Sequence, residues 1–388
     1  MNLTREEEGI LNGEQGAAAA KAMEILLAIG KIFKAEKLIP VTSAQISGVS
    51  YKTIGDAGLE FLESFAKDGR VKIPSYLNPA GMDVEGWREM GIPKEFARKQ
   101  IRIIRAYQKM GVEPTCTCTP YLINILPKKN EHVAWSESSA VVFANSALGA
   151  RTNRESGMSA LAAAIIGKTP CFGYHLDENR IAHLVVDVKT KLEDMSDFGA
   201  LGIYSGRIAK QRVVAFQGIE TVTVDEVKSL GAALAASGAV ALFFIKDITD
   251  EWKVVDKPEK VEFTEKELKE TKESLNSSND AELMAVGCPH CSLDEIREIA
   301  ERVRGKKLKR KLWVCTARKI KNKADKLGLT KIIEEAGGRI VCDTCMVVCP
   351  LEEMGFSTTA VNSGKAAHYL PGFCKQKVLF GSLKEILE

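Results

Sequence analysis

The chain has 388 residues, more than one hydrophobic core usually serves, so we expect two or more lobes. Hydrophobic residues make up 45% and charged residues 27%, and the net charge of +3 gives no reason to expect a nucleic-acid partner. No apolar run reaches membrane-spanning length and the first residues are acidic, which argues against a membrane span or a signal peptide and favours a cytoplasmic protein.

The first hundred residues alternate between helix and strand patterns. A helix over residues 15–35 and a strand over residues 38–42 precede a loop that contains Gly48, Val49 and Ser50 and leads into another helix. Backbone N–H groups at such a helix start suit an anion, although a serine there is also an ordinary helix cap. A second strand, predicted over 71–73, leads to a turn at Asn78 and Pro79 that is a further candidate for ligand contact.

Threonine and cysteine alternate over residues 115–118, which predicts a strand with Cys116 and Cys118 on one face. Cys116 also fits a small apolar core residue, whereas Cys118 lies beside a proline turn where a thiolate could reach a site. A buried helix then begins at Ser138 and Ser139, whose N–H and hydroxyl groups again suit an anion.

The pattern of the second half predicts the domain organisation. Strand and helix signals alternate through residues 160–250, and residues 251–280 are then rich in Lys and Glu, with one exposed helix over 265–275. We therefore predict an N-terminal α/β region over residues 1–250, of one or two lobes, a charged linker over 251–280, and a cysteine-rich α/β lobe over 281–388.

Seven of the ten cysteines lie in the last 101 residues. Short apolar runs precede them: residues 283–286 before Cys288, and residues 339–341 before Cys342 and Cys345. Such runs are typical of buried parallel strands, and open α/β sheets place their ligands at the carboxyl ends of these strands. In a cytoplasmic protein this pattern favours a metal or cluster site of three or four thiolates over disulfides.

Near the C-terminus, a Ser-Gly-Lys run that contains Gly364 and Lys365 adds a third helix start, this time with a cation. An anionic ligand at these helix starts would be held by backbone N–H groups and the Lys365 cation together. The candidate substrate-binding residues are therefore Gly48, Val49, Ser50, Asn78, Pro79, Ser138, Ser139, Gly364 and Lys365.

Five motifs, in this order from about residue 38 to residue 370, resemble the aconitase X family. They are Ser43-Ala-Gln-Ile-Ser-Gly-Val-Ser-Tyr, Cys118-Thr-Pro-Tyr, Trp135-Ser-Glu-Ser-Ser with Ala150-Arg-Thr-Asn-Arg, Gly287-Cys-Pro-His, and Asn362-Ser-Gly-Lys-Ala-Ala-His-Tyr. The resemblance implies an α/β fold of several aconitase-like lobes, with largely parallel sheets flanked by helices and the active site in the cleft between lobes.

The resemblance also implies a hydro-lyase with an iron–sulfur cofactor. The family motifs point to Cys118, Cys288 and Cys345 as the ligands of a [4Fe-4S] cluster, with a [2Fe-2S] cluster or mononuclear iron as alternatives. Cys291 and Cys342 remain open as replacements for Cys288 and Cys345, because each belongs to the same Cys-x-x-Cys pair.

Two substrates follow from the resemblance. For the phosphorylated one, which carries nearly two negative charges on its phosphate near neutral pH, the resemblance implies a phosphate site at residues 48–50, with Lys365 nearer the carboxylate or phosphate oxygens. Archaeal members dehydrate (R)-5-phosphomevalonate to trans-anhydromevalonate 5-phosphate in a modified mevalonate pathway, and bacterial members dehydrate cis-3-hydroxy-L-proline. The Lys- and Glu-rich composition favours the archaeal branch, in which a large subunit pairs with a small swivelling-domain subunit that supplies a serine as general base. A non-catalytic, metal-stabilised binding subunit is the alternative from another functional class.

Overall fold

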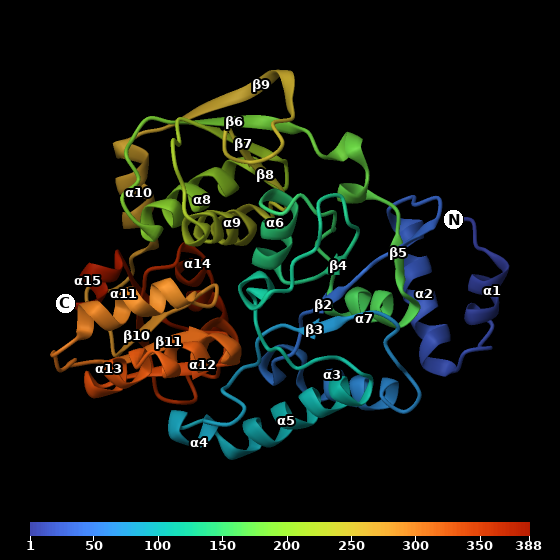
Figure 1. Cartoon of the computed structure of the whole chain (residues 1–388), viewed down its shortest axis with the longest axis horizontal. Coiled ribbons are helices and arrows are strands. Elements are labelled where there is room, and N and C mark those ends of the chain that lie inside the picture. Colours follow the sequence, from blue (N-terminus) through green and yellow to red (C-terminus); the bar gives the residue numbers. More distant parts are fainter.

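Figure 1 shows the computed structural model, which describes all 388 residues. The chain forms three lobes around a common centre. Each lobe contains a parallel sheet with helices packed on it, so the predicted α/β class with largely parallel sheets is confirmed. None of the helices combines the length and the apolar content that crossing a bilayer requires.

The first lobe contains a parallel sheet of three short strands in the order β3 (Ser75–Leu77), β2 (Ala44–Ile46), β4 (Ala134–Trp135). An antiparallel pair, β1 (Leu38–Pro40) and β5 (Lys168–Pro170), lies beside it. The alanine-rich helix α7 (Gly157–Ile166) is buried almost throughout, because its small side chains allow close packing on α2 (Ala17–Ile32). The other helices are α1 (Arg5–Leu11), α3 (Tyr51–Phe65), α4 (Trp87–Met90), α5 (Lys94–Lys109), the 3₁₀ helix η1 (Pro120–Ile123) and α6 (Ser138–Ser146).

The second lobe contains a four-stranded parallel sheet in the order β8 (Phe243–Ile245), β7 (Val214–Gln217), β6 (Ala182–Val188), β9 (Val254–Phe263). Helices α8 (Met195–Ala209) and α9 (Val224–Gly238) pack against each other beneath it (Figure 1). Glycine is required at Gly238 in their contact, since a Cβ atom there would lie 2.1 Å from the backbone oxygen of Gly206. Helix α10 (Glu265–Leu275) completes the lobe.

The third lobe contains a five-stranded parallel sheet in the order β12 (Gly338–Cys342), β11 (Lys311–Thr316), β10 (Leu283–Val286), β13 (Thr358–Val361), β14 (Lys377–Phe380). Alternate residues of its strands face two different cores: Leu283 and Ala285 face one, Met284 and Val286 the other. Burial on both faces explains the continuous apolar runs in the sequence. Helix α14 (Gly364–Cys374) covers one face, and α11 (Leu293–Val303), α12 (Arg318–Lys326), α13 (Leu329–Glu335) and α15 (Leu383–Leu387) cover the other.

Three sequence predictions need correction: the linker over residues 251–280, the strand over 71–73 and the strand over 115–118. Within the predicted linker over residues 251–280, the helix over 265–275 is present as α10, but β9 pairs in parallel with β6 and is part of the second sheet. The Lys- and Glu-rich composition of β9 fits an edge strand whose side chains face water. The strand predicted over residues 71–73 was also wrong, because no strand forms there and β3 begins only at Ser75.

The predicted strand over residues 115–118 does not form. Cys116 adopts a left-handed backbone conformation with φ of 43°, which ends the alternation of side chains. Cys116 therefore packs in the core of the first lobe, while Cys118 turns toward the centre of the molecule, and the two thiols do not share a face.

The carboxyl ends of the first and third sheets meet. Ala80 lies in the loop after β3, and Asp343 and Cys345 lie in the loop after β12. The Ala80 N–H donates to Asp343 O at 2.7 Å, and the Ala80 carbonyl oxygen accepts from the Cys345 N–H at 3.0 Å. A second contact joins Lys365, at the start of α14 after β13, to Glu137, just after β4. Both contacts bring the predicted site residues to the interface between lobes.

One buried amide holds three loops of the first lobe at this interface. Gln45 Nε2 donates to Asn78 Oδ1 and to Thr117 O, both at 3.3 Å, and Gln45 Oε1 accepts from the N–H of Glu137 at 2.9 Å. Gln45 is inaccessible to solvent, so no water can replace these partners if the amide is removed.

We predict that Gln45→Met destabilises the protein by roughly 2–4 kcal/mol, because it keeps the volume but leaves two buried backbone groups, Thr117 O and the Glu137 N–H, without their partner. Urea unfolding followed by circular dichroism measures the change. The matched control is Gln108→Met on the exposed face of α5, which should shift the free energy of unfolding by less than about 0.5 kcal/mol. Equal stability of the two variants would contradict this role of Gln45.

Candidate active site

Cys118, Cys288 and Cys345 lie in three loops that meet where the first and third lobes touch. Cys118 precedes η1, Cys288 follows β10, and Cys345 follows β12, so two of them occupy the carboxyl ends of parallel strands as predicted. Cys118 and Cys288 are 7% and 8% exposed, and Cys345 is partly buried.

The three thiols are close enough to influence one another electrostatically. Burial raises the pKa of Cys288 to about 12, and the neighbouring Cys345 adds to the increase. Burial likewise raises the pKa of Cys118, with contributions from Glu137 and from Cys345. The Lys365 ammonium opposes this increase in pKa at all three thiols. The structure therefore brings the three predicted ligands together around one cation.

The two alternative cysteines have other surroundings. Cys291 packs in the core between the third sheet and its outer helices, where Glu295 and Lys228 are its charged neighbours. Cys342 ends β12, and its charged neighbours include Asp343 and Asp83. Lys365 is a main electrostatic neighbour of Cys118, Cys288 and Cys345 but not of these two thiols, which favours Cys288 and Cys345 over them as ligands.

The donor set fits a thiolate-bound cluster. No group of three or more His, Cys, Asp or Glu side chains is spaced to hold a single metal ion. Iron–sulfur clusters are larger than one ion and take cysteine thiolates. Thiols with raised pKa values ionise readily only when a positive charge compensates for burial, as bound iron and Lys365 would do together.

Beside the thiols lies a buried ion pair between Glu137 and Lys365, whose residues are 7% exposed each. Burial opposes ionisation of Glu137, but Lys365 and hydrogen bonds from Ser139 and from the Ala140 N–H outweigh it and lower its pKa. Lys365 Nζ also lies 3.2 Å from Ser138 Oγ and 3.4 Å from Ser139 Oγ. The starts of α6 and α14 thus meet at one ammonium group.

The start of α3 offers unused hydrogen-bond donors. The backbone N–H groups of Gly48, Val49 and Ser50 donate to no protein acceptor, whereas the preceding N–H, of Ser47, donates to Ser136 Oγ at 2.6 Å. These three free N–H groups lie just before the helix, whose own first-turn N–H groups donate to Gln100 and Ser50, and they are donors that an anion can use. This arrangement is where the sequence predicted a cradle for a phosphate.

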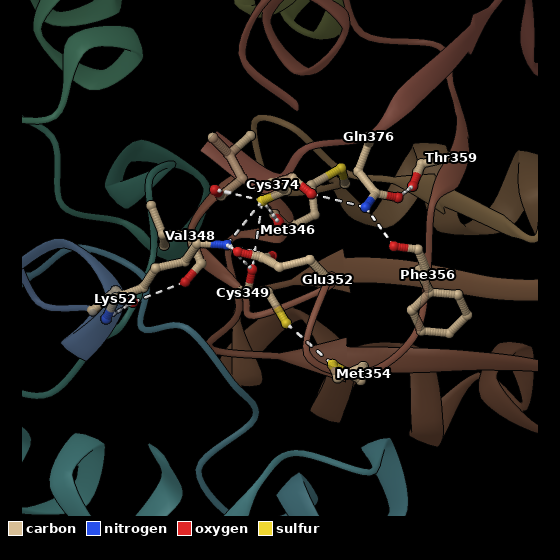
Figure 2. A network of polar contacts seen from close by, with 12 residues as sticks. Lys52, Met346, Val348, Cys349, Glu352, Met354, Phe356, Thr359, Cys374 and Gln376 are labelled. Carbon is tan, nitrogen blue, oxygen red and sulfur yellow. Dashed lines mark hydrogen bonds and ion pairs between the residues drawn. The ribbon is translucent and has the colours of Figure 1, made fainter. Parts of the chain in front are cut away.

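Two side chains of α3 fix this start against the loop after Cys345. Ser50 Oγ donates to Val348 O at 2.8 Å, and Lys52 Nζ donates to Cys349 O at 3.1 Å. Figure 2 shows Lys52 beside Glu352, to which it is paired at 2.7 Å, and the sulfur of Cys374 facing the backbone carbonyls of the same loop. The hydroxyl of Ser50 therefore joins two lobes, in addition to its position at the helix start.

The other predicted residues also lie at the interface between the lobes. Asn78 is partly exposed and accepts from Gln45, and Pro79 precedes Ala80, which is paired with the loop after β12. Gly364 opens α14 at a close contact, since a Cβ atom there would lie 2.8 Å from Gly199 O. All nine predicted substrate-binding residues thus lie in loops or helix starts at carboxyl ends of strands.

Sequence reasoning missed Glu137, Gln45 and His290 as residues of the site. The signal for Glu137 was an acidic residue between serines and a buried apolar helix, in the quoted Trp135-Ser-Glu-Ser-Ser motif. A cleft of about 920 Å³ elsewhere in the molecule would have misled as a guide, because it is lined by residues such as Arg154, Tyr174 and Gln211 and contains none of the cysteines. Chemistry therefore locates this site better than volume does.

Comparisons with known proteins agree with the motifs. Models of the aconitase X first, second and third domains match residues 1–178, 182–273 and 281–388. The phosphomevalonate dehydratase large subunit of Methanocaldococcus jannaschii is 54% identical, with all of both chains covered. A crystal structure of Thermococcus kodakaraensis aconitase X, described as the holo-form, superimposes with a TM-score of 0.94 at 46% identity, over 100% of this chain and 99% of that one.

A more distant relative carries the alternative activity. The cis-3-hydroxy-L-proline dehydratase of Pseudomonas aeruginosa is 33% identical over 98% of this chain, but the match spans only 68% of the longer relative. All three domain models, the identities and the shared fold lead to one conclusion: this chain belongs to the aconitase X family.

Proposed function

We propose that this chain is the large subunit of a hydro-lyase that dehydrates (R)-5-phosphomevalonate to trans-anhydromevalonate 5-phosphate in a modified mevalonate pathway. The observation that carries the proposal is the convergence of three thiols, the Lys365–Glu137 pair and the free N–H groups of residues 48–50 at one interface. The 54% identity to a phosphomevalonate dehydratase large subunit, over both full lengths, supports the choice of substrate.

Dehydration of a β-hydroxy acid removes a proton next to a carboxylate and releases the hydroxyl group as water. A [4Fe-4S] cluster on Cys118, Cys288 and Cys345 would supply a Lewis acid for the hydroxyl when bound. Lys365, held by Glu137, directs its ammonium group at the carboxylate or phosphate oxygens of the substrate. The serine hydroxyl of α6 beside it is a further donor for these oxygens. The N–H groups of residues 48–50 receive the phosphate, with Asn78 and Pro79 as the floor.

No general base is free among the buried groups beside the thiols. Glu137 is paired with Lys365, the buried Asp343 is paired with Arg318, and both ring nitrogens of the buried His290 have hydrogen-bond partners. We therefore infer that a serine of a small swivelling-domain subunit acts as the base, and that the working enzyme is at least a heterodimer. An archaeal source and a cytoplasmic location belong to the same proposal.

Dehydration of cis-3-hydroxy-L-proline is the second candidate, favoured by the relative from Pseudomonas aeruginosa. That substrate has no phosphate and would leave the donors of residues 48–50 unused. Its amine would need an acidic or carbonyl partner, whereas the buried Glu137 is already paired with Lys365. The free donors therefore favour the phosphorylated substrate. Nothing in the site favours a non-catalytic binding subunit, and the relatives are dehydratases.

We predict that Cys118→Ser, Cys288→Ser and Cys345→Ser each abolish iron and sulfide binding, because each removes a thiolate ligand. Protein purified without air should be brown, and iron and sulfide analysis measures the loss. Cys291→Ser and Cys342→Ser are matched controls from the same Cys-x-x-Cys pairs and should retain the cluster. Full iron retention in any of the first three variants would exclude that cysteine as a ligand.

We predict that the isolated large subunit, with its cluster intact, is inactive, because the general base is absent. Titration with the small subunit under anaerobic conditions should restore turnover up to a defined stoichiometry. Replacement of the candidate serine of the small subunit by alanine should leave complex formation unchanged but abolish turnover. A large subunit that turned over alone at the rate of the complex would refute this assignment of the base.

We predict that Ser50→Ala raises KM for phosphomevalonate roughly tenfold, because it disturbs the start of α3 where the phosphate is proposed to bind. The matched control is Ser382→Ala, which removes the N-cap hydroxyl of α15. Ser382→Ala should lose about 1 kcal/mol of stability, and Ser50→Ala more, since it also leaves Val348 O without its donor, but only Ser50→Ala should change KM. An unchanged KM in Ser50→Ala with an intact cluster would speak against a phosphate at α3.

A further inference from the structure

His290 is the residue at which all three cysteine-bearing loops are joined. Its ring Nδ1 lies 3.0 Å from Thr117 Oγ1, next to Cys118, and its ring Nε2 lies 2.9 Å from Thr344 O, next to Cys345. His290 itself lies two residues after Cys288. The imidazole is 1% exposed, so water does not compete for either contact.

The hydrogen-bond partners fix the tautomer of the ring. The Thr344 carbonyl oxygen can only accept, so Nε2 carries the proton and donates it. Nδ1 then accepts from the Thr117 hydroxyl, which in turn accepts from the N–H of Thr119 at 3.2 Å. With both nitrogens engaged, the imidazole has no lone pair left for a metal. His290 is therefore not a ligand in this arrangement.

The backbone of His290 makes two further contacts. Its N–H donates to Cys118 Sγ at 3.2 Å, and its carbonyl oxygen accepts from Lys228 Nζ at 3.2 Å. Lys228 comes from α9 in the second lobe, is 2% exposed, and is paired with Asp225 at 2.8 Å and with Glu295. All three lobes therefore contact this one residue.

We propose that His290 is a positioning residue for the cluster ligands: its imidazole holds the Cys118 and Cys345 loops at a fixed distance from Cys288, and its N–H donates to the Cys118 sulfur. The inference rests on the proposed cluster. Hydrogen bonds around ligands fix ligand geometry, and N–H donors to a coordinating sulfur stabilise the thiolate.

The test measures retention of the cluster and not activity. Thr117→Val replaces by a methyl group the hydroxyl that donates to Nδ1 and accepts from the Thr119 N–H, and His290→Gln keeps both that hydroxyl and a donor near the position of Nε2. Iron release to a chelator is measured under anaerobic conditions. We expect both reconstituted variants to lose iron roughly 10- to 100-fold faster than the unmodified chain. Thr117→Ser restores the hydroxyl and should restore slow release, which a mere loss of packing would not predict.

His175→Gln is the matched control, because His175 is a second buried histidine that contacts another ring, His132, at 2.9 Å. It should release iron at the unmodified rate, whatever its effect on the melting temperature of the apoprotein. Unmodified release rates in folded Thr117→Val and His290→Gln would overturn the role of His290 alone. An unmodified chain that bound no iron would instead overturn the cluster proposal, and this inference with it.

Discussion

The balance of charge among buried groups governs this site. Three thiols raised in pKa by burial share one neighbouring ammonium group, Lys365, and that group is itself paired with Glu137. Ionisation of all three thiols therefore requires more positive charge than the chain supplies there, and bound iron would provide it. Removal of one partner from such a buried pair costs about 3–5 kcal/mol, so Glu137 and Lys365 also join the first lobe to the third.

The fold serves this balance by bringing together loops that are distant in the sequence. The first and third sheets point the carboxyl ends of their strands at the same interface, and Ala80 pairs with the loop of Cys345 across it. The second lobe contributes Lys228, which contacts the loop of Cys288 from α9. The general base is the one element that we assign to another chain, which explains why a large subunit with a complete set of ligands would still need a partner.

The sequence predicted those parts of the fold and site that local patterns determine. The strand over residues 283–286 and the helix over 265–275 have the predicted bounds, because an apolar run and a capped, charged helix are local signals. The family motifs led to cysteines that the structure brings together. The free N–H groups at the start of α3 also follow from a local feature, a loop with Gly48 before a helix.

The missed parts depend on contacts between distant residues. Glu137 meets Lys365 across 228 positions, and Thr117 meets His290 across 173, so neither pair leaves a local signature. The strand β9 was hidden because its charged residues resemble those of a linker, and its pairing with β6 is a tertiary fact. The left-handed backbone of Cys116 likewise follows from its loop and not from the Thr/Cys alternation that predicted a strand.

A substrate comparison tests the central claim most directly. The chain and its small subunit, reconstituted with iron and sulfide without air, would be assayed on (R)-5-phosphomevalonate and on cis-3-hydroxy-L-proline, with mass spectrometry to detect the loss of one water. We expect a kcat/KM for phosphomevalonate at least about 100-fold higher, because only that substrate occupies the free donors of residues 48–50. Equal turnover of both substrates, or a preference for cis-3-hydroxy-L-proline, would contradict the phosphate cradle and the function built on it.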